Sequence, residues 1–155
     1  MKRTSPEVAG FSLIELIVAM LITAILASIA IPAYSSYVRK SRRTEAKTAV
    51  LDLASLEERF FSVNNTYTTD SASLGYPAGN NWPYTLASGY YTIASPAITP
   101  PSTTGPATFT LTVTVVPNTD QAKDTQCVSF AVNSAGVQSA SSSTLSPDPN
   151  TTCWR

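Results

Sequence analysis

An apolar segment near the N-terminus and an amphipathic segment after it dominate the pattern of this sequence. The run from Leu16 to Val38 contains no charged side chain. As a helix, a run of this length crosses a bilayer once. Further on, apolar residues recur at three- and four-residue steps, which is typical of a helix with one buried side; these residues are Ala46, Ala49, Val50, Leu53, Leu56, Phe60 and Val63. We predict one helix over residues 11–64, with an apolar half at 11–38 and a second half packed under a sheet.

Two features should shape this helix. Pro32 lies inside it, and proline lacks the backbone N–H of a regular helix, so we expect a kink there. Asn64 and Asn65 follow the last turns, and asparagine tolerates the left-handed conformation that ends many helices. We therefore expect the helix to end at this pair.

The rest of the chain alternates between strand patterns and turn-rich segments. Apolar residues alternate cleanly with threonine over residues 107–116, which is typical of a strand with one buried face. We predict further strands over 90–95, 127–132 and 137–140, loops over 65–89 and 96–106, and a low-complexity tail over 141–152. A long helix with an antiparallel sheet is an α+β fold.

Glu15 is a carboxylate at the mouth of the apolar run. An ionisable side chain in a membrane segment costs free energy unless it is paired, so its presence indicates a function. Cleavage after Gly10 would create an amino group at Phe11, and this amine is the obvious partner. The alternative is that Glu15 lies among lipid headgroups and merely marks the end of the span.

The residues around Glu15 resemble a known signature. Gly10 is followed by Phe-Ser-Leu-Ile-Glu-Leu, after a short leader that carries Lys2 and Arg3. This resembles the prepilin signature of type IV pilins and pseudopilins, and Pro32 falls where that family has a helix-kinking proline. The segments 124–132 and 153–154 look most like PilE-type minor pilins.

The resemblance implies a type IV pilin fold and a processing pathway. Residues 1–10 would be a leader that a prepilin peptidase removes between Gly10 and Phe11, and the same enzyme would methylate the nitrogen of Phe11. Glu15 would act in assembly with other pilin subunits on a pilus assembly platform. Residues 65–155 would form a globular head.

Cys127 and Cys153 are the two cysteines, and the chain has no histidine. This set disfavours a metal site and favours a disulfide, which would contribute about 3–4 kcal/mol by loop-closure entropy. Two free buried thiols are the alternative. We predict no cofactor, and we predict no enzyme because no catalytic constellation occurs. The adjacent Glu57 and Glu58 diverge by about 100° on a helix, so we expect a solvated face.

Charge gives conflicting indications of topology. Five basic residues follow the span and two precede it, which by the positive-inside rule places the C-terminal part in the cytoplasm. The cysteine pair and the leader favour the opposite orientation. We predict a single-pass inner-membrane protein with a periplasmic head, which then enters an extracellular pilus.

We predict a structural subunit of a type IV pilus, a minor pilin, with roles in pilus biogenesis, twitching motility and adhesion. The alternatives are a pseudopilin of a type II secretion system, a DNA-receptor pilin, and an envelope-anchored binding domain that never polymerises. Beyond residue 65 the charged residues are Lys123, Arg155 and four aspartates, which give a net charge of about −2. This balance disfavours nucleic acid as a partner.

Overall fold

The computed structural model describes residues 11–76, 82–103, 105–144 and 148–155. The chain divides into two compact units, Met1–Tyr37 and Val38–Arg155. Helix α1, Leu13–Asn64, has 52 residues and contributes to both units. It stays helical through Pro32, and the kink expected there stays a prediction. The left-handed Asn65 (φ 53°) follows the helix, which confirms the expected end.

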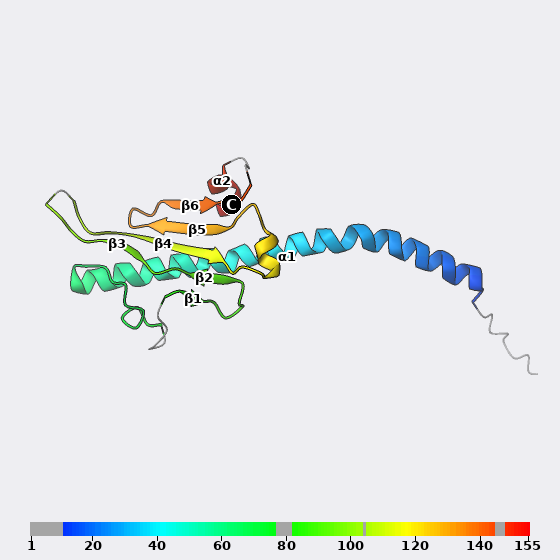
Figure 1. Ribbon diagram of the computed structural model, residues 1–155, viewed down its shortest axis with the longest axis horizontal. Helices are drawn as coiled ribbons and strands as arrows, with labels where there is room; N and C mark the ends of the chain where they lie inside the picture. Colours follow the sequence, from blue (N-terminus) through cyan, green and yellow to red (C-terminus); the bar gives the residue numbers. More distant parts are fainter. Residues whose placement is uncertain (1–10, 77–81, 104, 145–147) are drawn as a thin grey trace, which may run out of the picture. The chain divides into compact units, whose positions relative to one another are not determined.

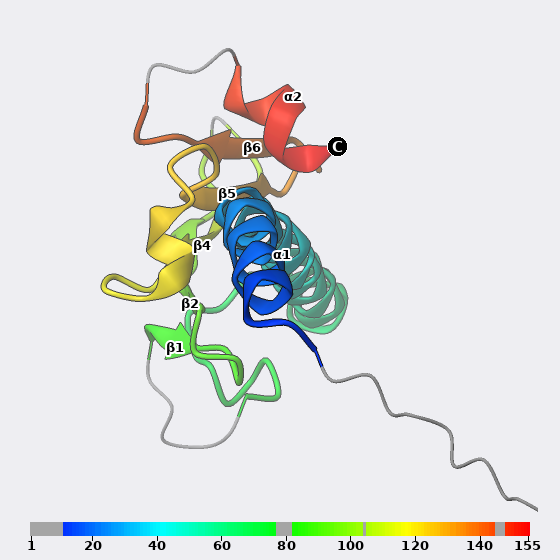
Figure 2. The ribbon, with the colours of Figure 1, turned by 90° about the vertical axis from the view of Figure 1, so that its right-hand side faces the viewer.

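The second unit contains an antiparallel sheet that lies along one side of the second half of α1 (Figures 1 and 2). Its order is β1-β2-β4-β5-β6. β2 pairs with residues 113–115 at the end of β4, and β3 pairs with residues 108–110 at its start. The strands are β1 Tyr84–Thr85, β2 Tyr91–Ile93, β3 Ala97–Thr99, β4 Thr108–Val115, β5 Ser129–Asn133 and β6 Gln138–Ser141. A short 3-10 helix, η1 Asp120–Lys123, precedes β5, and helix α2, Pro149–Trp154, follows β6. The predicted α+β fold is confirmed.

The core forms between α1 and the sheet because β4 alternates as its sequence predicts. Phe109, Leu111 and Val113 are buried, and the threonines between them lie on the outer face. On α1 the matching stripe of Ala46, Val50 and Leu53 is fully buried. The described residues of the first unit do not belong to this core.

Three segments differ from the sequence-based prediction. The expected loop at 96–106 contains β3, which forms because residues 97–99 find pairing partners at 108–110 of β4. The loop at 65–89 contains β1, which pairs with β2. The tail predicted at 141–152 overlaps helix α2, whose first turn is capped because the Asp148 side chain accepts a hydrogen bond from the Asn150 N–H.

Two positions on α1 were also predicted wrongly. Val63, the last residue of the predicted apolar stripe, is 77% exposed. Glu57, expected on a solvated face, is fully buried. Its burial reflects a polar contact with the chain that follows the helix, described below.

Candidate functional site

The first candidate site is the N-terminal end of α1. Phe11 is 85% exposed, and Glu15 lies in the first helical turn. The two residues line one depression of about 300 Å³ together with Leu16 and Ala19. Within the described part of the chain, Glu15 has no ion-pair partner. The predicted cleavage residue Gly10 lies outside the described residues.

The apolar half of α1 is exposed along its length. Among the described residues, α1 is the one helix that is long and apolar enough to cross a membrane. The mean hydropathy of its most apolar 18-residue window is 2.6, and no residue of that window is buried. Large apolar side chains face outward, such as Leu13 at 76%, Ile25 at 63% and Ile29 at 69% exposure. Because such a surface is costly in water, it needs lipid or other protein chains to cover it.

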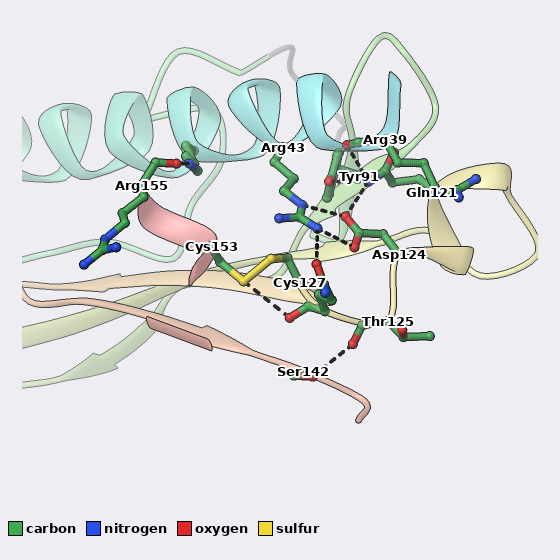
Figure 3. A network of polar contacts seen from close by, with 12 residues as sticks. Arg39, Arg43, Tyr91, Gln121, Asp124, Thr125, Cys127, Ser142, Cys153 and Arg155 are labelled. Atoms are coloured by element: carbon green, nitrogen blue, oxygen red, sulfur yellow. Dashed lines mark hydrogen bonds and ion pairs between the residues drawn. A yellow bond between two sulfur atoms is a disulfide. The ribbon is translucent and has the colours of Figure 1, made fainter. Parts of the chain in front are cut away.

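The second candidate site is a buried polar network where α1 meets the segment around η1 (Figure 3). Arg43 binds Asp124 in a bidentate pair, Nε to Oδ2 and Nη2 to Oδ1, each at 2.7 Å. The Arg43 side chain is 9% exposed and the Asp124 side chain 5%. Gln126 accepts a further hydrogen bond from Arg43 Nη2 at 3.3 Å. A paired and hydrogen-bonded charge is the form in which proteins tolerate buried ions.

Gln121 joins this network to the sheet. Its Nε2 donates to Asp124 Oδ2 at 3.3 Å, to the Tyr91 hydroxyl at 2.9 Å and to the Arg39 carbonyl at 3.1 Å. Burial, and secondarily the Asp124 charge, raise the pKa of Tyr91 well above its usual value, so its hydroxyl stays protonated. The network therefore holds α1, β2 and η1 to one another.

A more exposed set of charges surrounds Asp120. Its carboxylate faces Arg39 at 3.7 Å, Arg42 at 3.5 Å and Lys123 at 3.4 Å. The Arg42 guanidinium also lies 3.8 Å from the centroid of the Tyr90 ring, a cation–π contact. Three of the five basic residues that follow the apolar run, Arg39, Arg42 and Arg43, thus pair with acids of the head. Sequence reasoning missed these pairs because the partners lie far apart along the chain.

The disulfide ties α2 to the chain just before β5. Cys127 and Cys153 are bonded, with Cα atoms 5.8 Å apart, which confirms the predicted bridge. Trp154 Nε1 donates to the Ser139 carbonyl at 2.9 Å. Lys47 Nζ donates to the main-chain oxygen of Arg155 at 3.0 Å, at the Arg155 labelled in Figure 3. The second contact places the main chain of Arg155 beside the Lys47 ammonium.

Glu57 fixes the chain that leaves α1. Its Oε2 accepts a hydrogen bond from the Thr68 N–H at 3.1 Å, and its Oε1 is buried without a partner among the described residues. Burial raises the pKa of Glu57, the Thr68 hydrogen bond opposes this rise, and the Glu58 charge adds to it. Glu58 accepts a hydrogen bond from the Tyr67 hydroxyl at 3.1 Å. The two carboxylates therefore hold the segment 67–68 against the helix.

Comparison with known proteins gives two family matches. Residues 32–131, more than half of the 155 residues, match the family described as "Type IV minor pilin ComP, DNA uptake sequence receptor". Residues 7–31 match the "Prokaryotic N-terminal methylation motif", a range that includes Gly10, Phe11 and Glu15.

Two relatives are similar over part of their length. The chain is 34% identical over 87 residues to the "Type IV major pilin protein PilA" of Myxococcus xanthus (strain DK1622), covering 55% of this chain and 40% of that protein. It is 36% identical over 75 residues to the "Fimbrial protein EcpC" of Eikenella corrodens, covering 48% of this chain and 49% of that protein. The chain thus matches less than half the length of either relative. Together with the exposed apolar helix and the sheet packed on its second half, these matches show that the chain belongs to the type IV minor pilin family.

Proposed function

We propose that this protein enters a type IV pilus as a minor subunit through its N-terminal helix. The observation that carries the proposal is the exposed apolar surface of α1, which begins at Leu13, two residues after Phe11 and within the matched methylation motif. Lipid covers this surface before assembly, and the helices of neighbouring subunits cover it in the filament. The head, which folds on the second half of α1, then lies on the filament surface.

Glu15 and Phe11 set the register of assembly. Removal of residues 1–10 by a prepilin peptidase leaves an amine on Phe11, which the same enzyme methylates. In a filament core, where water is scarce, an unpaired carboxylate is heavily penalised, and a matched pair is tolerated. A subunit therefore fits only where its Glu15 meets the amine of a neighbour's Phe11.

The proposed topology has a single span in the inner membrane and a periplasmic head. The disulfide between Cys127 and Cys153 supports this orientation, since such bonds form and persist in oxidising compartments. The peptidase acts at the membrane, and the pilus assembly platform then draws the subunit into the filament. For the alternative of a secretion-system pseudopilin, the descriptions of the matched families and of the two relatives give no support, since they name pilins, a methylation motif and a fimbrial protein.

A direct test is the composition of sheared pili. We expect peptides of this protein in the sheared fraction, at lower abundance than the major subunit, with an N-terminus at methylated Phe11. A mature chain that starts after residue 33 would indicate an ordinary secretory signal. Absence from sheared pili, with the processed protein abundant in the membrane, would favour an envelope-anchored domain that never polymerises.

A second function, DNA reception, is favoured by the description of the matched family. The net charge, which the sequence analysis held against a nucleic-acid partner, also becomes a weaker argument. The compact unit Val38–Arg155 includes the second half of α1 as well as the head, and it holds eight Lys or Arg and eight Asp or Glu, so it is neutral. Among these acids, Asp120 and Asp124 are engaged by arginines of α1, and Glu57 is buried.

Fluorescence anisotropy of labelled duplex DNA with the purified full-length protein tests this function. DNA reception predicts binding that weakens steeply with salt, because phosphate contacts release counterions. It also predicts reduced natural transformation in a deletion strain that still makes pili. Normal transformation in such a strain would leave the structural role alone.

A further inference from the structure

A pocket in the head unit gathers basic side chains that the proposed assembly mechanism does not use. Its volume is about 260 Å³. Helix α1 forms one side, and the chain just before β5 and helix α2 form the other. The lining residues are Lys40, Arg43, Thr44, Lys47, Gln126, Thr152, Cys153 and Arg155.

Basic side chains outnumber acidic ones around this pocket. Asp124 neutralises Arg43, but Lys40, Lys47 and Arg155 have no ion-pair partner among the described side chains. The ammonium of Lys47 donates to the main-chain oxygen of Arg155. Burial lowers the pKa of Lys47, and the nearby positive charge of Arg43 lowers it further. A bound anion would relieve this repulsion.

The donors present suit a phosphate group. Lysine ammonium groups and an arginine guanidinium are the side chains that proteins use most for phosphate oxygens. The Thr44 hydroxyl adds a neutral donor. Gln126 accepts from Arg43 through Oε1, which leaves its amide N–H groups as further donors.

The position of the pocket along the sequence indicates the source of the anion. Lys40 is the second residue after the charge-free run that ends at Val38. Lys47 follows seven positions later, about 10 Å further along a helix. A headgroup layer extends roughly 5–7 Å beyond the hydrocarbon core on each side. With Val38 at the edge of the core, Lys40 lies within that layer, and the flexible Lys47 side chain reaches its outer surface.

We propose that this pocket binds the phosphate headgroup of an anionic phospholipid while the subunit waits in the membrane. The inference rests on the proposed membrane residence before assembly. The bound headgroup fixes the depth of the helix and the orientation of the head above the bilayer. Incorporation into the filament requires that the lipid is released. The disulfide supports the site because it ties α2, which forms one wall of the pocket, to the chain just before β5.

Native mass spectrometry of the full-length mature protein in detergent, titrated with phosphatidylglycerol or phosphatidylcholine, tests the proposal. The test variant is K40Q/K47Q. The control is R59Q/K123Q, which removes the same charge at two residues outside the pocket. We expect a preference for phosphatidylglycerol that falls about tenfold in K40Q/K47Q and less than twofold in R59Q/K123Q. Equal losses in both variants, or no preference in the wild type, would overturn the proposal.

Two competition arms identify the source of the phosphate. Millimolar inorganic phosphate and a short DNA duplex are added separately to the protein–lipid complex. The lipid assignment predicts that neither displaces phosphatidylglycerol efficiently. If phosphate alone bound as tightly, the site would serve a free anion. If the duplex displaced the lipid from the wild type and bound the K40Q/K47Q variant more weakly than the wild type, the site would serve nucleic acid.

A third arm separates this inference from the proposed function. Each variant is reconstituted in vesicles and extracted with alkaline carbonate. Wild type and both variants should remain in the membrane, because the span is unchanged. Protein that inserts but shows no headgroup preference contradicts the pocket inference alone. Protein that does not insert contradicts the membrane residence and, with it, the inference.

Discussion

Arg43 and Asp124, which lie on distant parts of the sequence, form a bidentate buried ion pair with both N···O distances at 2.7 Å. Arg43 belongs to α1, one turn after the basic series begins at Arg39, and Asp124 directly follows η1. The pair fixes the sheet side of the head to the helix. It also explains why a helix with an apolar core face carries a buried arginine.

Removal of one partner of this pair should destabilise the head strongly. Asp124→Ala leaves the Arg43 guanidinium buried and unpaired, which typically costs about 3–5 kcal/mol. Urea denaturation of the full-length protein in detergent, followed by tryptophan fluorescence, measures the loss. Asp120→Ala is the matched control, because its carboxylate is 42% exposed and should contribute less than about 1 kcal/mol. Similar losses for both variants would contradict the assigned role of the buried pair.

The raised pKa of Glu57 predicts a dependence of stability on pH. The folded state holds a proton on this carboxyl more tightly than the unfolded state does. The corresponding stability is present at pH values below the unfolded pKa and is lost as pH rises through the folded pKa. Glu57→Gln, which cannot ionise and can still accept from Thr68, should therefore gain stability relative to wild type as pH rises from acid to neutral.

Denaturation midpoints of wild type and Glu57→Gln between pH 4 and pH 8 check this prediction. The difference in the free energy of unfolding should grow with pH and then become constant. A constant difference over the whole range would mean that Glu57 does not titrate differently in the folded state.

Loss of the disulfide should free α2. The double substitution Cys127→Ser/Cys153→Ser should cost about 3–4 kcal/mol by the loop-closure estimate. Limited proteolysis should then cut the tail after β6 much faster than in wild type, since α2 is too short to be stable by itself. An unchanged cleavage rate would show that contacts such as Trp154 to Ser139 hold α2 without the bridge.

The sequence predicted those parts of the fold that hydrophobic periodicity controls. α1 begins close to its predicted start, and β4 lies within the predicted strand at 107–116, because both carry regular apolar patterns over many residues. β3 and α2 were missed for a different reason. Each forms because a distant segment offers hydrogen bonds or a disulfide, and their own residues show no pattern.

The polar parts of the head were the least predictable. Glu57 and Arg43 have charged side chains, and hydropathy alone places such residues on the surface. Their burial depends on partners at Thr68 and Asp124, which only the folded chain brings close. Phe11 and Glu15 were found by their motif and not by their contacts, since their proposed partners belong to other subunits.

The pairing of Glu15 with a neighbour's Phe11 is the central claim of the assembly account. Glu15→Ala makes the span more apolar, so insertion into the membrane should be unchanged or improved. In the filament, the amine of a neighbouring Phe11 would be left buried and unpaired, at a cost of about 3–5 kcal/mol. Glu15→Gln should recover only part of the loss, because the amide restores a hydrogen bond without the charge.

The most direct measurement is the ratio of this protein in the sheared pilus fraction to that in the membrane fraction, for wild type, Glu15→Gln and Glu15→Ala. The account predicts that the ratio falls in that order, with processed Glu15→Ala protein accumulating in the inner membrane. Equal ratios for all three would place Glu15 among the lipid headgroups and contradict the proposed mechanism of assembly.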